Sequence, residues 1–207
     1  MSDKFKSEEW TVVAFDMCSS SDIIEDLTLT GNLRHLTFVL NKVKDFVRER
    51  STKHDMKPYK FMGDGWLLLF PPTVRGGDIL QFATDLSRFF FQLSRARIEP
   101  HLDRKPSVRG LTFGIDCGHL ARTVMLGRTE YLGRPLNVAC RLQSAIKDRD
   151  KNPQYKMLVT RTFYQRHLDS LKPFGPWPTS RKLRNIRAGE TFRCVKFDLD
   201  VPAKTKV

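Results

Sequence analysis

Two aspartates stand where strand-forming residues give way to turn-forming ones. Asp16 ends the apolar run WTVVAF, and Asp64 lies in the Gly-Asp-Gly of PYKFMGDGWLLLF. Asp-Gly is a common hairpin turn, because glycine accepts positive φ and aspartate hydrogen-bonds its own backbone. A carboxylate at the end of a buried strand, however, needs a cation or a metal to offset its loss of water. The two carboxylates together fit a hard divalent ion such as Mg²⁺ or Mn²⁺, which prefers oxygen ligands.

The charge balance points to an anionic partner. The formal net charge is +13 at pH 7, which attracts polyanions, nucleic acid as well as nucleotides. The basic residues are spread along the chain, and the sequence has no RNA-binding aromatic signature or zinc-finger spacing. A non-enzymatic basic domain that binds nucleotides or nucleic acid therefore stays as the alternative to an enzyme.

Length and cysteine usage indicate the general type of protein. The 207 residues suffice for one buried core, and no linker or repeat divides them, so we expect a single domain over residues 1–207. No apolar stretch reaches the roughly 18 residues of a membrane helix, and the N-terminus lacks the apolar core of a signal peptide. The four cysteines have neither zinc-site nor disulfide spacing. We expect a soluble, cytoplasmic protein with reduced thiols.

The hydrophobic pattern predicts the elements that position the carboxylates. We expect strands at 10–17, on either side of 63–65, twice within 107–126 and at 155–160, a C-terminal hairpin ending near 197, and helices at 32–50, 78–97, 133–146 and 161–171. The order β-α-β-β-α-β followed by further elements predicts an α+β fold with a ferredoxin-like core and C-terminal additions.

Three segments together resemble the motif regions of the class III nucleotidyl cyclases, the catalytic domain of adenylate and guanylate cyclases. They are VVAFDMCSSSDI, YKFMGDGWLLLF and GRTEYLGRPLNVACRLQSAI, in the order and spacing of the family. The resemblance implies the class III cyclase fold, a homodimer with composite active sites at its interface, and two divalent metal ions, Mn²⁺ or Mg²⁺. It also implies conversion of a nucleoside triphosphate to a 3′,5′-cyclic monophosphate and pyrophosphate.

The first two motif regions supply the metal ligands that the resemblance implies. Asp16 and Asp64 match the two metal-binding aspartates, and the backbone carbonyl of Met17 matches a further ligand beside the first. The turn over residues 18–21 would offer backbone N–H groups to the phosphates ahead of the following helix.

The third region supplies the groups that would act on the ribose and the phosphates. Asn137 and Arg141, four residues apart on one helix face, match the ribose-orienting asparagine and the arginine that stabilises charge developing on the α-phosphate. For the terminal phosphates the resemblance points to Arg187, and less directly to Arg184.

Two residues match the base-reading positions of the family. Lys60 matches the lysine of adenylate cyclases, whereas Glu130 stands where the family usually has aspartate or threonine for adenine and cysteine for guanine. Lysine donates and glutamate accepts, a pattern that adenine, cytosine and uracil each satisfy; guanine, with its cysteine partner, is disfavoured. Glutamate reaches roughly 1.5 Å further than aspartate, which favours a smaller ring.

A compact, free-standing cyclase, as we expect here without a regulatory, receptor or membrane segment, also resembles the short cyclases of the bacterial Pycsar anti-phage systems, in which cyclic UMP or cyclic CMP activates a separate effector. We therefore expect a uridylate cyclase that makes cyclic UMP from UTP in antiviral defence, ahead of a cytidylate cyclase. An adenylate cyclase in ordinary signalling is a further alternative. A catalytically inactive nucleotide sensor would lack one of the aspartates or the arginine, and this sequence retains them.

Overall fold

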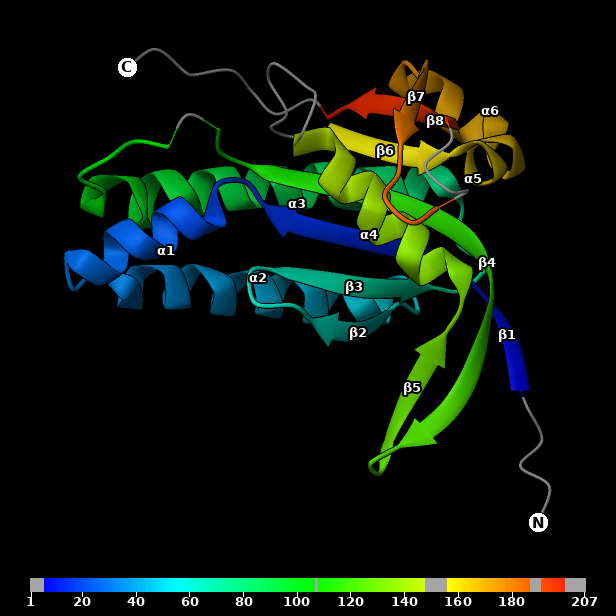
Figure 1. The fold of residues 1–207 in the computed structure, drawn as a ribbon, viewed down its shortest axis with the longest axis horizontal. Helices are drawn as coiled ribbons and strands as arrows, with labels where there is room; N and C mark the ends of the chain where they lie inside the picture. The colour runs from blue at the N-terminus through cyan, green and yellow to red at the C-terminus, as the bar shows by residue number, and fades with distance from the viewer. Residues whose placement is uncertain (1–5, 107, 148–155, 187–190, 200–207) are drawn as a thin grey trace.

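The computed structural model of the chain describes residues 6–106, 108–147, 156–186 and 191–199. Figure 1 shows a long twisted sheet with helices on both of its faces. Within the described ranges, no helix combines the length and the apolar composition that a membrane span requires. In chain order the helices and strands are β1 (Lys6–Met17), α1 (Ser20–Leu29), α2 (Leu33–Lys53), β2 (Lys57–Phe61), β3 (Gly65–Phe70), α3 (Gly76–Arg97), β4 (Leu111–Met125), β5 (Arg128–Leu132), α4 (Arg134–Lys147), β6 (Lys156–Thr160), α5 (Arg161–Arg166), α6 (Leu168–Leu171), β7 (Trp177–Lys182) and β8 (Thr191–Asp198).

The sheet has the strand order β2-β3-β1-β4-β6-β8-β7, and β5 pairs with β4 outside this path. Its first four strands are all antiparallel neighbours, and they form the β-α-β-β-α-β core with α2 and α3 as the connecting helices. Strand β6 adds to this core parallel to β4, and β8 and β7 extend the sheet further. The predicted α+β fold with a ferredoxin-like core and C-terminal additions is confirmed.

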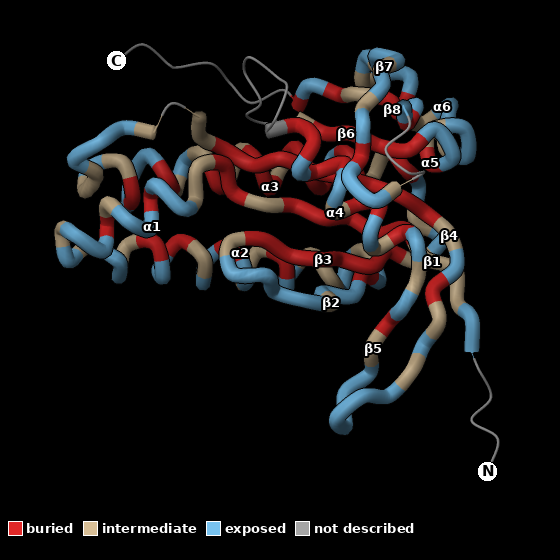
Figure 2. The backbone as a smooth tube through the Cα atoms, in the orientation of Figure 1, coloured by how far each residue is buried: buried red, intermediate tan, exposed pale blue. Residues whose placement is uncertain are grey.

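Strand β1 separates two hydrophobic clusters by the alternation of its side chains. Val13 and Phe15 pack in the large cluster with α2 and α3, whereas Val12 and Ala14 pack in a smaller cluster on the opposite face, which includes Ala139 of α4. Figure 2 shows the central strands buried along most of their length. Because successive side chains of a strand point to opposite faces, Asp16 belongs to the face of α4.

The prediction of two strands within residues 107–126 is wrong, because β4 is one strand. It pairs with β1 in unbroken register from Arg122 to Leu111, straight through Gly118. A Cβ on Gly118 would come within 3.2 Å of the Pro135 side chain, so this glycine makes room for the start of α4. The chain reverses only at Leu126 and Gly127, whose φ angles of 50° and 74° suit a tight hairpin turn.

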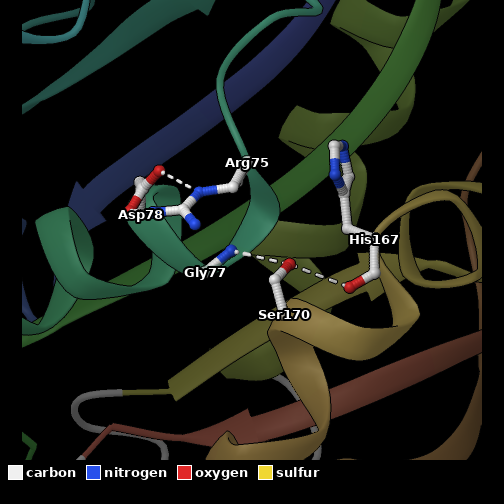
Figure 3. A network of polar contacts seen from close by, with 5 residues as sticks. All are labelled: Arg75, Gly77, Asp78, His167 and Ser170. Atoms are coloured by element: carbon white, nitrogen blue, oxygen red, sulfur yellow. Dashed lines mark hydrogen bonds and ion pairs between the residues drawn. The ribbon is translucent and has the colours of Figure 1, made fainter.

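The predicted helix over 161–171 is divided at His167 into α5 and α6, and the second of these supports the N-terminus of α3 (Figure 3). The Gly77 N–H donates to Ser170 Oγ at 3.2 Å, and Ser170 Oγ donates to the carbonyl of His167 at 2.9 Å. An ion pair of 3.0 Å between Arg75 and Asp78 closes the first turn of α3. These contacts join the C-terminal additions to the ferredoxin-like core.

All four cysteines are free thiols, and burial governs their reactivity. Burial raises the pKa of the Cys117 and Cys194 thiols to about 11. It also raises the pKa of Cys140, which is half-buried. At pH 8 only about one in a thousand thiols with a pKa near 11 is ionised, and the thiolate is the reactive form.

We therefore expect the folded protein to react very slowly with a thiol reagent at pH 8, and the unfolded protein to react quickly at four sites. Labelling with N-ethylmaleimide, counted by intact mass with and without denaturant, measures this. Fast modification of Cys117 or Cys194 in the folded protein would contradict the burial of these two thiols.

Candidate active site

Asp16 and Asp64 lie at the same end of two neighbouring antiparallel strands. Asp16 of β1 is the pairing partner of Gly65, the first residue of β3, and Asp64 directly precedes that glycine. A Cβ on Gly65 would collide with the carbonyl oxygen of Phe15 and would lie 3.0 Å from Asp16 Oδ1. Glycine at this position therefore lets the two strands, and with them the two carboxylates, approach closely.

The donor atoms at this strand end fit a hard divalent cation. Asp16 is half-buried, the Oδ2 atom of Asp64 is buried, and the Met17 side chain lies in the core, so Met17 would have to contribute through its backbone. The described residues include no cluster of three or more histidine, cysteine or acidic side chains that would hold a metal by themselves. Mg²⁺ is commonly held by one or two carboxylates together with substrate phosphates, and this donor set has that composition.

The turn after Asp16 leads into α1 but differs in one respect from the prediction. The Cys18 N–H donates to the carbonyl of Gly110 at 2.9 Å, so this group is not directed at a ligand. Ser19 adopts the left-handed conformation with φ 52°, and α1 begins at Ser20. The first N–H groups of a helix have no intrahelical acceptor, so of the turn predicted to meet phosphates only residues 19–21 remain as candidates.

Helix α4 presents Asn137 and Arg141 on its exposed side. Ala139 and Leu142 are buried, whereas the polar pair is exposed. The helix packs tightly on β4, since a Cβ on Gly114 would collide with the Ala139 carbonyl. The asparagine and the arginine thus face away from the sheet, where they are accessible to a ligand or to another chain.

A buried carboxylate that the sequence analysis did not identify fixes the start of α4. Asp116, in the middle of β4, lies 3.5 Å from the guanidinium of Arg134 and is 1% exposed. It also accepts hydrogen bonds from the Thr160 hydroxyl at 2.8 Å and the Cys117 N–H at 2.9 Å. Burial raises the pKa of Asp116, although these three partners oppose the effect. The only signal in the sequence is a charge inside the apolar run LTFGIDCG.

Lys60 and Glu130, far apart in the sequence, lie together in an open cleft. The Lys60 Nζ is 3.9 Å from Glu130 Oε2, and the glutamate side chain is only 27% exposed. The cleft has a volume of about 770 Å³ and lies between β2, β3, the β4–β5 hairpin and the start of α4. The residues that line it are Tyr59, Lys60, Leu67, Met125, Leu126, Arg128, Glu130, Tyr131, Leu132 and Leu136. The structure therefore places both predicted base-reading residues in one cleft of one chain.

Tyr59 also lies in this cleft, and, like Asp116, it was not predicted as a site residue from the sequence. Its hydroxyl donates to Glu130 Oε2 and accepts from the backbone N–H of Tyr131 at 3.0 Å. Phe61, on the other side of Lys60, packs against Trp66 with ring centroids 4.6 Å apart. Both aromatic residues flank Lys60 in the sequence. Only the geometry of the strand shows that Tyr59 contacts Glu130 whereas Phe61 contacts Trp66.

The basic residues expected at the terminal phosphates are described only in part. Arg187 lies outside the described residues. Arg184 is exposed in the connection between β7 and β8, where Asn185 has a φ of 59°.

Solved structures of nucleotide cyclases are similar to this one. A bacterial light-regulated adenylyl cyclase matches with a TM-score of 0.70 and 14% identity over 96% of this chain, which spans 54% of that protein. The adenylyl cyclase CyaB from P. aeruginosa matches with a TM-score of 0.62 and 17% identity over 99% of both chains. The guanylyl cyclase Cya2 matches with a TM-score of 0.64 and 17% identity, over 98% of this chain and 96% of that one.

No family model matches the sequence, and no curated protein is significantly similar to it. The structural matches nevertheless define the architecture: the chain has the fold of the class III nucleotide cyclase catalytic domains, as the motif regions predicted. Because adenylyl and guanylyl cyclases share it, the fold does not select a base.

Proposed function

We propose that the protein is a nucleotide cyclase that converts a ribonucleoside triphosphate, preferentially UTP, to the 3′,5′-cyclic monophosphate and pyrophosphate. Residues 1–207 would form its single catalytic domain, working in the cytoplasm where its substrate is made. The observation that carries the proposal is the pair of carboxylates, Asp16 and Asp64, at adjoining strand ends of a cyclase fold, with glycine at position 65 allowing their approach.

In this proposal each residue acts on a different part of the substrate. Asp16, Asp64 and the Met17 carbonyl would hold two divalent ions, which when bound favour loss of the 3′-hydroxyl proton and offset the charge of the triphosphate. The 3′-oxygen then bonds to the α-phosphorus while the bond to the bridging oxygen of the pyrophosphate breaks. Asn137 would orient the ribose, and Arg141 would meet the charge that develops on the α-phosphate with its forked donors.

The terminal phosphates would be met by basic side chains and by helix α1. Arg187, or Arg184 as the alternative, would bind them from the C-terminal region, and the backbone of residues 19–21 would donate from the N-terminal turn of α1. The net charge of +13 would favour the approach of such an anion.

The base would enter the cleft of Lys60 and Glu130. Parallel hydrogen bonds to two neighbouring atoms of a base require a donor and an acceptor side by side, and Lys60 Nζ lies 3.9 Å from the Glu130 carboxylate. Uracil, cytosine and adenine each offer the complementary pair of atoms. The length of glutamate supports a pyrimidine, with UTP ahead of CTP and ATP as the remaining alternative.

A homodimer with composite sites is part of the proposal. The hairpin of β5 and the end of β4 extends away from the sheet (Figure 1), and it exposes large apolar side chains, including Val124 at 68%, Leu126 at 102% and Leu132 at 51%. Phe61 and Met62 are also exposed, at 52% and 41%. Apolar side chains gathered in this way are typical of association surfaces, and a second copy would cover them.

The experiment that tests the function supplies the purified protein with each of the four ribonucleoside triphosphates and Mn²⁺ or Mg²⁺, and identifies the products by mass spectrometry. We expect cyclic UMP as the main product. A preference for ATP would overturn the pyrimidine assignment. Absence of any cyclic product, together with nucleic-acid binding that weakens steeply with salt, would replace the enzyme by a basic binding domain.

The proposed biological role is that of a second-messenger enzyme in bacterial anti-phage defence, with a separate effector that responds to the cyclic nucleotide. Its support is the resemblance to the short Pycsar cyclases. Cells that carry the gene together with its effector should survive phage challenge better than cells with an Asp64→Asn variant, and equal survival would remove this role.

Substitution of Glu130 by glutamine should alter base selection more than metal dependence. Glutamine keeps the size of the side chain but turns an acceptor into a group that both accepts and donates. Loss of a charged hydrogen bond to the base costs about 1.5–3 kcal/mol, or roughly tenfold to a hundredfold in specificity. The measurement is kcat/KM for UTP, CTP and ATP in both proteins, and an unchanged ranking at unchanged rates would show that Glu130 does not contact the base.

A further inference from the structure

Tyr59 occupies an irregular position in strand β2. The pairing of β2 with β3 shifts between Pro58 and Lys60, so Tyr59 forms a bulge in the ladder. A bulge bends its strand and changes the direction of the side chain it carries, and such bulges are common beside active sites. Here it directs the tyrosine into the cleft, where its ring meets that of Tyr131 edge-on at 5.3 Å.

The two hydrogen bonds of the Tyr59 hydroxyl determine each other's direction. The backbone N–H of Tyr131 can only donate, so the tyrosine oxygen accepts from it at 3.0 Å. The hydroxyl proton is then free to point at Glu130 Oε2, which accepts it. Consecutive residues of β5, Glu130 and Tyr131, are thus held by one hydroxyl of β2.

This arrangement assigns different tasks to the two oxygens of Glu130. Among the described residues, both of its polar contacts, the hydrogen bond from Tyr59 and the ion pair with Lys60, fall on Oε2. Oε1 remains as the oxygen that can accept from a ligand in the cleft. The carboxylate cannot rotate freely without losing the hydrogen bond from Tyr59.

An acceptor that is held in place beside a donor distinguishes bases by the order of their edge atoms. Uracil carries its N–H in the ring and its acceptor oxygen outside it, whereas cytosine and adenine carry an acceptor nitrogen in the ring and an amino donor outside it. A mobile glutamate could accept from either position. A glutamate held in place accepts well from only one of them.

We propose that Tyr59 is a positioning residue for base selection: by holding Oε2 of Glu130 it fixes the side of the cleft on which the acceptor lies, and so separates uracil from the amino-bearing bases. The inference rests on the proposed function, in that Lys60 and Glu130 read the base. It adds a residue that contacts neither the base nor the reacting atoms but acts through Glu130.

The test uses Tyr59→Phe, which removes only the hydroxyl and keeps the ring contact with Tyr131. Isothermal titration with the 3′-deoxy forms of UTP, CTP and ATP measures binding without turnover, because these nucleotides lack the attacking hydroxyl. The Kd of the cytosine nucleotide divided by the Kd of the uracil nucleotide measures the preference for uracil. We expect this Kd ratio to fall by roughly tenfold in the variant. The matched control, Tyr164→Phe, removes a tyrosine hydroxyl from α5 and should leave the ratio unchanged.

Spectroscopy tests the contact itself, independently of nucleotide binding. Burial raises the pKa of Tyr59, and the hydrogen bond to Glu130 adds to the increase. With ¹³C-labelled tyrosine, the chain gives four ring signals, and Tyr59→Phe identifies the one that belongs to Tyr59. Glu130→Gln should lower the pH at which this signal titrates, and an unchanged titration would show that the contact is wrong.

The outcomes separate the inference from the proposed function. An unchanged Kd ratio in Tyr59→Phe, or a wild type that binds the three nucleotides equally or not at all, would overturn the role of Tyr59. A reduced ratio without cyclic product from the natural triphosphates would keep Tyr59 as a positioning residue and remove the cyclase activity.

Discussion

Replacement of Asp16 or Asp64 by asparagine should lower cyclase turnover by about a hundredfold to a thousandfold. Each substitution removes the charge of one metal ligand with almost no change in volume, and metal stabilisation of the transition state is worth several kcal/mol, where each 1.4 kcal/mol is about tenfold in rate. Since the pairing of β1 with β3 is made by backbone groups, the fold should persist. Initial rates at saturating Mn²⁺ and thermal unfolding curves measure the two effects.

The matched control is Asp169→Asn on the short helix α6, because that side chain is 97% exposed and its ion pair is with Lys172, the residue that follows this helix. It should retain full activity. Metal binding gives a second readout: the paramagnetic resonance signal of free Mn²⁺ in the presence of nucleotide should report weaker binding in both strand-end variants. Wild-type turnover in Asp16→Asn or Asp64→Asn would disprove the assignment of these carboxylates to the metals.

A one-to-one mixture of inactive Asp64→Asn and inactive Arg141→Ala chains should regain roughly a quarter of the wild-type activity. In the proposed homodimer the aspartates of a site come from one chain and Lys60, Glu130, Asn137 and Arg141 from the other. Random pairing makes half of the dimers mixed, and each mixed dimer contains one intact site and one doubly damaged site. The exposed position of Arg141 on α4 suits a residue that reaches a neighbouring chain.

The control mixture combines Asp16→Asn with Asp64→Asn. Both lesions affect the same half of the composite site, so every mixed dimer lacks an intact site and the mixture should stay inactive. Subunit exchange is verified by energy transfer between chains that carry different dyes. If exchange is complete and the first mixture remains inactive, the site is not shared between two chains.

Features that depend on neighbouring residues could be predicted from the sequence. The apolar run before Asp16 forms β1, and the Gly-Asp-Gly turn joins β2 to β3, because strand alternation and turn chemistry act over a few residues. The helical period that buries Val43 and Val47 likewise predicted α2. The order of these elements was then sufficient for the ferredoxin-like core.

The prediction failed where a partner strand decides the local conformation. Gly118 has the properties of a turn residue in isolation, yet β4 continues through it because β1 supplies an unbroken row of hydrogen-bonding partners on one side. The turn moved to Leu126 and Gly127, where the pairing with β1 has already ended. Tertiary pairing therefore overrode the local preference of one glycine.

The sequence by itself determined which residue types are present for chemistry: two carboxylates at strand ends, a polar pair on one helix face, and a lysine and a glutamate at the positions that we propose to read the base. Only the tertiary structure decided that Tyr59 rather than Phe61 supports Glu130, and that Asp116 anchors α4 through Arg134. These contacts join strands and helices that are distant in the sequence, and they depend on a bulge and on strand register. The physical reason is that a shift of one residue in a strand turns each side chain to the opposite face, and that choice is made by the packing of the whole sheet.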